Sequence, residues 1–304
     1  MAAKVTRDAM ESYLSCKTKA HLMLAGQQGS KSAYEALLKK FRAEVGIEAT
    51  DKILARHQDH EIERGVVLTP AVLRRGAAFI LEAALEDEDA SLSIDGLMKV
   101  AGPSRLGQFH YIPMLFSESG KVGKGHRFVL SLIGHFLARL QGLNPGTGIV
   151  WHGKACKATK IRLETDPRKS ERLLEEIRQT NSTEQVPALI LNGHCRVCEF
   201  QQRCTAQAQR EDNISLLRGM SEKEVRKQIR KGIFTVTQLS CTFRPRRHNK
   251  RAGRRVQPHY HALKALSVRD KKVHVLGKPL LPAKPTDVYF QRSARGLEKP
   301  LFRP

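Results

Sequence analysis

The sequence predicts an α/β fold in which a mixed sheet is flanked by helices. Apolar residues recur at helical spacing up to about residue 85, strand-like alternation begins at Ser91, and helical spacing returns at residue 126. Helices followed by a sheet and then by further helices pack as layers around a core. The length of 304 residues is enough for one large domain or two smaller ones.

Three helices are expected before the first strand. The first runs from Thr6 to about Leu24, with Thr6 as its N-cap and Cys16 on the helix or at its end. The second covers residues 32–45. The third covers residues 70–85, because proline at its first position suits the first turn of a helix.

A β-hairpin is expected after these helices. Residues 91–100 alternate apolar and polar side chains, residues 109–116 form a second strand-like run, and residues 101–107 have the composition of a turn. Further along the chain, helices are expected at residues 126–141 and 167–179, and strands at residues 148–152 and 160–163.

The composition predicts a protein of the reducing cytoplasm. Six cysteines are too few for a disulfide-stapled secreted scaffold, and the first residues lack the apolar stretch of a signal peptide. The sequence contains no run of 18 apolar residues, so no membrane-spanning segment is expected.

The chain is strongly basic, with a formal net charge of +23. Residues 218–304 contain 23 Lys and Arg and 5 Asp and Glu, a net charge of +18, whereas residues 1–217 contain 30 and 25, a net charge of +5. Because Lys and Arg gain affinity by releasing counterions from phosphates, an anionic polymer is the expected partner. A merely solvated basic surface and a ribosome-associated role are the alternatives. The change in charge marks a boundary near residue 218.

Three cysteines lie close together in the sequence, at Cys195, Cys198 and Cys204. Thiolates at this spacing can bind one soft metal centre, which needs a fourth ligand from elsewhere in the fold, and Cys16 can supply it. Two alternatives stay open: a zinc ion with His194 as a substitute ligand, and buried cysteines that bind nothing. The two remaining cysteines, Cys156 and Cys241, have no partner at ligand spacing and are expected to be packing residues.

The two cysteine-bearing segments, residues 9–16 and 192–204, resemble those of the RecB-like nuclease family of the PD-(D/E)xK group, in the branch that carries an iron–sulfur cluster. The similarity covers about residues 5–210. It implies a restriction-endonuclease-like fold over residues 1–210 and a four-iron four-sulfur cluster that joins the two ends of this domain. The cluster is expected to be structural, because closing so long a loop removes much chain entropy. Its implied ligands are Cys16, Cys195, Cys198 and Cys204, with zinc as the alternative occupant.

The same resemblance implies metal-dependent hydrolysis of phosphodiester bonds in DNA. Members of the family hold magnesium or manganese on an Asp and a second acid from neighbouring strands, and a Lys two residues after the second acid assists the attacking water. Asp95 matches the first acid and is the expected metal ligand, the alternative being a solvated Asp at a strand end. Leu115 and Ser117 stand near the positions of the second acid and the lysine.

The expected catalytic site therefore departs from the family pattern. The upstream helix has residues 33–35 where a metal-binding His is expected, and the helix after the hairpin lacks the Gln that members often use. A site with a single carboxylate binds magnesium weakly. Glu35, Glu118 and Lys121 are the candidate catalytic substitutes. Three classes stay open: an active DNA nuclease, a non-catalytic nucleic-acid-binding module, and a zinc-stabilised RNA-associated protein.

A second, DNA-binding region is expected after the nuclease-like domain. Residues 211–243 resemble a helix-hairpin-helix unit, whose turn can hold a DNA phosphate on backbone amides; an ordinary pair of linking helices is the alternative. Residues 244–255 have almost no apolar content and are expected to be a flexible phosphate-binding segment, or else a solvated loop. The basic residues of this segment are Arg244, Arg246, Arg247, Lys250, Arg251, Arg254 and Arg255.

Residues 244–304 as a whole are expected to form a basic, partly disordered extension, with a short helix after Tyr260 and strands at residues 272–277 and 286–290. Longer proteins that this region resembles continue into an acidic RNase H-like exonuclease domain and often a helicase. The next residues, 291–296, carry no acid. We therefore expect that the chain is the N-terminal part of such a protein, with an exonuclease or helicase domain lost from it or encoded beside it.

Overall fold

The computed structural model describes residues 4–30, 32–58, 61–88, 90–180, 186–244, 260–274, 288–292 and 298–302. The chain divides into two units, residues 1–215 and residues 216–304, which are called unit 1 and unit 2 and are described separately.

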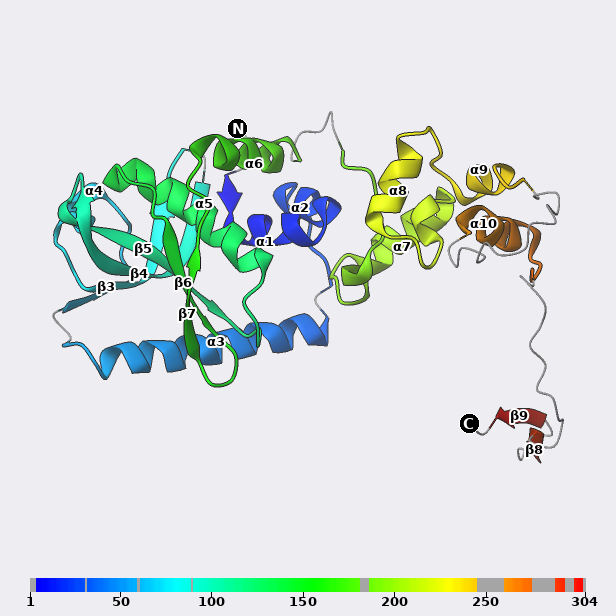
Figure 1. The fold of residues 1–304 in the computed structure, drawn as a ribbon, viewed down its shortest axis with the longest axis horizontal. Coiled ribbons are helices and arrows are strands. Elements are labelled where there is room, and N and C mark those ends of the chain that lie inside the picture. Colours follow the sequence, from blue (N-terminus) through cyan, green and yellow to red (C-terminus); the bar gives the residue numbers. More distant parts are fainter. Residues whose placement is uncertain are drawn as a thin grey trace, which may run out of the picture. The chain divides into compact units, whose positions relative to one another are not determined.

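Unit 1 is built on one mixed, open sheet of seven strands (Figure 1). Six of them follow the order β2-β3-β4-β5-β6-β7, and β1 pairs with the first residues of β4. The pairs β3–β4, β4–β5 and β6–β7 are antiparallel, whereas β1–β4, β2–β3 and β5–β6 are parallel. The strands are β1 (Val5–Thr6), β2 (Ile62–Arg64), β3 (Phe79–Glu86), β4 (Ala90–Ser104), β5 (Gly107–Ser117), β6 (Thr147–His152) and β7 (Lys157–Arg162).

Helices cover both faces of this sheet (Figure 1). On one face lies α3, whose Val45, Ala49 and Ile53 pack against apolar side chains of β3 and β5. The other face is covered by α1, α5 and α6. The helices of unit 1 are α1 (Arg7–Ser15), α2 (Lys17–Leu24), α3 (Ala33–Leu54), α4 (Pro70–Arg74), α5 (Lys124–Gln141), α6 (Pro167–Gln179) and α7 (Gln201–Arg210).

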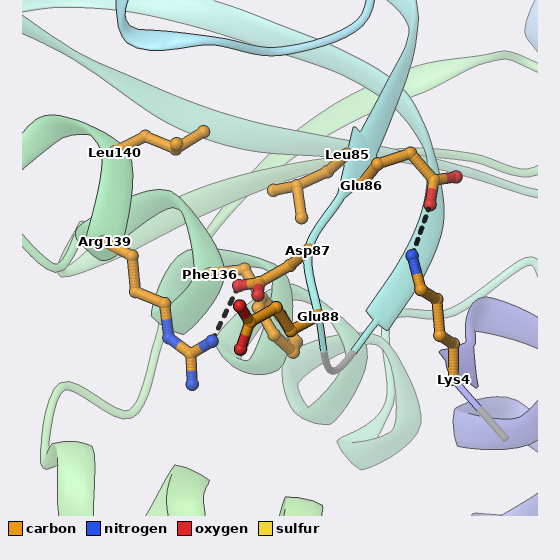
Figure 2. A pocket seen from close by; sticks show the side chains of 8 residues that line it. All are labelled: Lys4, Leu85, Glu86, Asp87, Glu88, Phe136, Arg139 and Leu140. Carbon is orange, nitrogen blue, oxygen red and sulfur yellow. Dashed lines mark hydrogen bonds and ion pairs between the residues drawn. The ribbon is translucent and has the colours of Figure 1, made fainter. Parts of the chain in front are cut away.

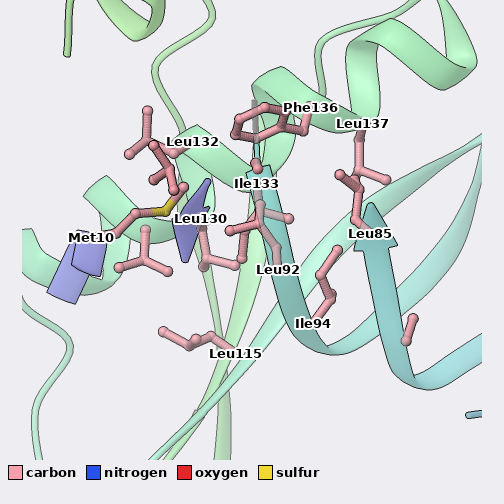
Figure 3. Close-up of a cluster of buried hydrophobic side chains, with 14 of the residues drawn as sticks. Met10, Leu85, Leu92, Ile94, Leu115, Leu130, Leu132, Ile133, Phe136 and Leu137 are labelled. Carbon is pink, nitrogen blue, oxygen red and sulfur yellow. The ribbon is translucent and has the colours of Figure 1, made fainter. Parts of the chain in front are cut away.

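The main hydrophobic core lies between the sheet and α1, α5 and α6 (Figure 3). Met10 of α1 and Leu130 and Ile133 of α5 pack there with Leu92 and Ile94 of β4. Each apolar side chain that is fully buried in this way contributes about 1.5–3 kcal/mol to folding. This packing holds the N-terminal helix α1 against the central strand β4.

Several sequence-based expectations are confirmed in unit 1. The predicted hairpin is present as β4 and β5, although its strands extend closer to the turn than expected. The helices predicted at residues 126–141 and 167–179 are α5 and α6, and the strands predicted at residues 148–152 and 160–163 are β6 and β7.

The helix predicted over residues 70–85 is wrong. Thr69 and Pro70 start a helix as expected, with the Thr69 hydroxyl accepting from the Val72 amide, but α4 ends after five residues. Gly76, at φ 74°, then turns the chain into β3, which is buried over most of its length. A strand with apolar residues on both faces lacks the alternation that distinguishes it from a helix in sequence.

The single helix predicted from Thr6 to Leu24 is two helices. Thr6 caps α1 as predicted, its hydroxyl accepting from the Ala9 amide at 3.2 Å. At Cys16 the backbone becomes extended (φ −165°, ψ 120°), which ends α1 and starts α2. The helix predicted at residues 32–45 begins as expected but continues to Leu54.

Unit 2 contains three helices among its described residues: α8 (Glu222–Ile229), α9 (Val236–Cys241) and α10 (His261–Asp270), of which α9 and α10 pack together. It also contains a two-stranded antiparallel sheet of β8 (Val288–Arg292) and β9 (Glu298–Phe302). Residues 272–274 are not in a strand, and residues 275–277 of that predicted strand lie outside the described residues. In the basic segment, Arg244 is exposed, and the other six predicted DNA-binding residues lie outside the described residues.

No helix in the described part of the chain is both long enough and apolar enough to cross a membrane.

Candidate metal centre and acidic site

Four cysteines line one small pocket in unit 1, which we call the thiol pocket. Cys16 lies at the break between α1 and α2, Cys195 in a short 3₁₀ helix, Cys198 just after it, and Cys204 in α7. The pocket therefore brings together both ends of unit 1. It is also lined by Lys19, His194 and Gln201 and by the apolar side chains of Leu189, Ile190 and Phe200.

The loop that carries Cys195 is held by Asn192. The side-chain oxygen of Asn192 accepts from the His194 amide at 3.0 Å, while its side-chain amide donates to the Ser15 carbonyl at 2.9 Å. The second bond ties the loop to the last residue of α1, next to Cys16. The Asn192 backbone amide points at the Cys195 Sγ, 3.3 Å away. Such amides stabilise a thiolate more than a thiol.

Burial and mutual repulsion raise the pKa of three of these thiols above the ordinary value. Burial and the neighbouring thiols of Cys16, Cys198 and Cys195 raise the pKa of Cys204 to about 11. Burial also raises the pKa of Cys195 and of Cys198, the second against the opposing effect of Lys19. A cation that binds here must displace these protons, so its affinity rises with pH.

The described residues contain no group of three or more His, Cys, Asp or Glu side chains placed as ligands of a single metal ion. The four thiols nevertheless share one pocket, and Cys16, Cys198 and Cys195 raise the pKa of Cys204.

A buried lysine joins the thiol pocket to α3. Lys19 of α2, whose side chain is only 12% exposed, donates to Glu35 at 2.9 Å and pairs with Glu199 at 3.4 Å. Burial alone lowers the pKa of Lys19, but the bond to Glu35 and the nearby acids raise it above its ordinary value. Glu35, predicted as a catalytic substitute, is therefore engaged beside the thiol pocket.

The cysteine loop also contacts the start of α3 through backbone groups. The Ser30 amide donates to the Glu199 carbonyl at 3.0 Å, and the Ser32 hydroxyl donates to the Val197 carbonyl at 2.9 Å. At Gly29 an added Cβ would lie 2.6 Å from the Glu199 Cγ and 2.8 Å from its carbonyl carbon. Only glycine permits this close approach. We call Lys19, Gly29, Ser32, Glu35 and Glu199 together the α3 clasp.

Asp95, the predicted metal ligand, is fully engaged with protein groups. Arg7 of α1 donates to both of its carboxylate oxygens, at 2.5 and 3.1 Å, and the Phe116 amide donates to Oδ2 at 2.6 Å. The Arg7 side chain is 9% exposed. Bidentate pairing with a guanidinium is the strongest ordinary hydrogen-bonding arrangement of a carboxylate.

Two more acids and a second arginine extend this pairing. Glu11 accepts from Arg7 at 3.0 Å and from Arg42 of α3, and Arg42 also donates to Glu118 at 3.1 Å. Burial raises the pKa of Glu11, but Arg42 and Arg7 outweigh burial and bring this pKa below its ordinary value. We call Arg7, Glu11, Arg42, Asp95 and Glu118 the acidic site. Each of its three carboxylates bonds to at least one of its two guanidiniums.

The backbone is irregular beside Asp95. The β3–β4 ladder is regular on both sides of Asp95, but Glu82, the residue across from it, has φ 54° and is missing from the register. A left-handed conformation at a non-glycine residue is uncommon in a strand and stores strain. The strain thus falls at the position where the acid is presented.

Ser117 and His126 form a bonded pair near Glu118, with the Ser117 Oγ 2.9 Å from the His126 Nε2. The Gly123 amide donates to the His126 Nδ1 at 3.0 Å, so Nδ1 carries no proton and Nε2 is the protonated nitrogen. His126 therefore donates to Ser117 and cannot act as a base for its hydroxyl. Lys121, the fourth predicted catalytic residue, is exposed in the next loop.

In the α8–α9 turn of unit 2, the backbone amides already have partners in the protein. The amides of Lys231 and Ile233 donate to the Gln228 carbonyl, and that of Gly232 donates to the Ile229 carbonyl. The amides of Phe234 and Thr235 donate to the Gln238 side chain at 2.8 and 3.1 Å. A phosphate at this turn would compete with these bonds, so the charged groups that the turn offers to an anion are side chains. Besides Arg226, which pairs with Glu222, the exposed basic ones here are Lys223, Lys227, Arg230 and Lys231.

A separate hollow lies between the end of β3 and α5 (Figure 2). Four of its five charged side chains form ion pairs, Lys4 with Glu86 at 3.4 Å and Arg139 with Asp87 at 2.6 Å, and the fifth is the acid Glu88. These pairs leave the hollow without a convergent set of donors that could bind a ligand.

Sequence reasoning selected the four cysteines that share the thiol pocket, and it selected Asp95 and Glu118, which the acidic site brings together through the arginines. It did not select Arg7, Glu11, Arg42 or Lys19. Their only signal was Arg7 and Glu11 at i,i+4 spacing, which is common on solvated helices.

The chain matches no known protein-family model, and no curated protein matches it.

Proposed function

We propose that the protein binds DNA without cleaving it, on a RecB-like nuclease fold whose unit 1 is held together by a four-iron four-sulfur cluster. The observation that carries the choice against catalysis is the bidentate Arg7–Asp95 pair. Magnesium binds through carboxylate oxygens and dehydrates reluctantly. It would have to displace a buried guanidinium from Asp95, and an unpaired buried charge costs several kcal/mol.

The thiol pocket supports a cluster as the structural group. Its donors are thiols in largely apolar surroundings, a set that suits soft metal centres. A single zinc ion needs each sulfur about 2.3 Å from one point, whereas a four-iron cube holds its thiolates farther apart, around a volume. Four thiols in one pocket match the number of cysteine ligands that such a cube takes. Cys16, Cys195, Cys198 and Cys204 would hold it, and it would supply a covalent link between α1, α2 and α7.

The charge of unit 2 supports DNA as the partner. Residues 218–304 contain 23 basic and 5 acidic residues, and the exposed basic side chains of α8 and its turn offer several phosphate contacts. Contacts to phosphate position a protein on DNA without reading its sequence, so binding is expected to be non-specific.

The cluster is tested by anaerobic purification with iron, sulfide and zinc analysis. A brown protein with broad absorbance near roughly 400 nm is expected. Cys16→Ser should lose iron, whereas Cys241→Ser, at an exposed cysteine in unit 2, should retain it. Stoichiometric zinc with no iron or sulfide would instead support the zinc-stabilised class.

The absence of catalysis is tested with labelled DNA in magnesium and in manganese. We expect no cleavage, and binding that persists in a chelator and weakens steeply with salt. Cleavage that needs the metal and is abolished by Asp95→Ala would contradict the proposal and favour an active nuclease. Binding that does not change with salt would rule out the contact with phosphates.

A further inference from the structure

Two loops leave neighbouring strand ends of unit 1 side by side. β5 and β6 are parallel and end in register at Ser117 and His152. Just beyond, the Gly153 amide donates to the Ser117 carbonyl at 3.3 Å, and a Cβ on Gly153 would lie 3.5 Å from the Gly120 Cα. The β5–α5 loop and the β6–β7 turn therefore form one continuous edge of unit 1.

This edge carries four exposed lysines. Lys121 lies in the β5–α5 loop and Lys124 is the first residue of α5, while Lys154 lies in the β6–β7 turn and Lys157 is the first residue of β7. None of the four side chains has a bonded partner among the described residues, in contrast to most charged groups nearby. We call these four lysines the loop rim.

The acids nearest to the loop rim are already neutralised. Glu118, the only acid within the two loops, accepts from Arg42 at 3.1 Å. On α3, Glu48 pairs at 2.8 Å with Lys52, which also donates to the Ala155 carbonyl of the β6–β7 turn. Glu118 and Glu48 are therefore paired, whereas Glu44 and Asp51 on the adjoining part of α3 are exposed acids.

The acidic site makes this basic edge independent of metal. Three bare carboxylates at a strand edge repel phosphate until divalent cations neutralise them. Arg7 and Arg42 offset two of these three charges permanently, through bonds to Asp95, Glu11 and Glu118. A polyanion can thus approach without a metal. Gly120 and Gly123 carry no side chain, and an added Cβ at either would meet no atom within 4 Å. The backbone at this edge is therefore open to a large ligand.

We infer that the loop rim is a second DNA-binding surface, on unit 1, which contacts backbone phosphates without a divalent metal. The inference rests on the proposed function in that both need DNA as the partner. It differs from that proposal in placing a separate set of phosphate contacts outside the basic unit 2.

The test compares double variants of the full chain by fluorescence anisotropy with a short labelled DNA duplex in chelator. Lys121→Gln/Lys124→Gln and Lys154→Gln/Lys157→Gln should each weaken binding on the order of tenfold. Each should also flatten the slope of log K against log salt by about 0.9 for every phosphate that the variant no longer neutralises. All four positions are exposed, so melting temperatures should not change.

The matched control removes two charges at the other end of the sheet. Arg64 at the end of β2 and Arg74 of α4 are exposed, and neither side chain has a bonded partner among the described residues. Arg64→Gln/Arg74→Gln should bind with the wild-type slope. A slope reduced equally in this control would mean that only net charge matters, and it would overturn the inference.

A variant of unit 2, Lys223→Gln/Lys227→Gln/Arg230→Gln/Lys231→Gln, separates the two proposals. Loss of binding in this variant, with unchanged binding in both rim variants, would overturn the inference and leave the proposed function standing. A wild-type protein that binds no duplex would remove both. Binding that disappears in chelator would overturn the metal-independent contact.

Discussion

Arg7 holds the position that decides the chemistry of the acidic site. A guanidinium is always charged, and its planar donors match the two oxygens of a carboxylate, which a hydrated metal ion or a lysine cannot reproduce. Arg7 uses two of its nitrogens on Asp95 and the third on Glu11. Arg7 and the two acids thus neutralise one another, so that none of these charges is buried without a counter-charge.

Removing Asp95 from the Arg7–Asp95 pair should destabilise the folded protein. Asp95→Ala leaves the Arg7 guanidinium, 9% exposed, with Glu11 as its remaining acid, and we expect a loss of about 3 kcal/mol in the free energy of unfolding, measured in urea. Asp51→Ala, at an exposed position of α3, is the control and should cost less than about 0.5 kcal/mol. Equal stabilities of the two variants would show that the Arg7–Asp95 pair does not stabilise unit 1.

Glu11 should make stability depend on acid pH. Its pKa in the folded protein lies below the ordinary 4.5, so folding is stabilised by the ionised form above that pH. This stability is lost as the pH falls from 4.5 through the folded-state pKa, because the unfolded chain then takes up the proton first. In thermal melts from pH 6 downward, the melting temperature of Glu11→Gln should fall less steeply with decreasing pH than that of the wild type. An identical decline would contradict the coupling of Glu11 to Arg42 and Arg7.

At the scale of elements, α3 connects the two sites of unit 1. Glu35 near its start reaches Lys19 beside the thiol pocket, and Arg42, two turns later, reaches Glu11 and Glu118 in the acidic site. The two positions lie seven residues apart on one face of a helix. A displacement at the start of α3 is therefore expected to reach both sites.

Gly29→Ala tests the α3 clasp. The new methyl group would lie 2.8 Å from the Glu199 carbonyl carbon and oxygen, a backbone position that can yield only if the Cys198–Glu199 segment shifts. We expect a loss of about 1–3 kcal/mol in stability and a lower iron content after purification. Gly193→Ala in the same cysteine loop meets no atom within 4 Å and should retain both. Equal iron content in the two variants would show that the clasp does not position the cysteines.

Elements with one buried and one exposed face could be predicted from the sequence more readily than elements buried on both faces. β4 begins with alternating buried and less buried residues, so its period appears in the sequence, whereas β3 is apolar on both faces and was mistaken for a helix. The break at Cys16 has no glycine or proline to announce it, and it depends on contacts such as Asn192 to Ser15 that join distant parts of the chain. The cysteine spacing predicted which thiols share a pocket. It did not predict Arg7 as the partner of Asp95, because this contact also joins distant parts of the chain.

At the scale of the whole molecule, the charge is divided between the two units. Unit 1 has nearly balanced charges and uses most of its acids in ion pairs, so its loop rim is a local feature. Unit 2 has a large excess of basic residues, and its three described helices contain few acids. If both units contact DNA as proposed, the two sets of contacts should reinforce each other, since the second contact forms at a high effective concentration.

The cluster should stabilise only one of the two units. Its proposed ligands lie at the two ends of unit 1, so the link restricts nearly the whole unfolded chain of that unit, and by the loop-closure relation for covalent links its loss costs on the order of 5 kcal/mol. None of these ligands belongs to unit 2. After iron is chelated, hydrogen exchange should quicken in α1, α2, α7 and the sheet, while amides in α8, α9 and α10 keep their protection. Equal loss of protection in both units would mean that the two fold cooperatively, and unchanged exchange in unit 1 would mean that no bound centre holds its ends together.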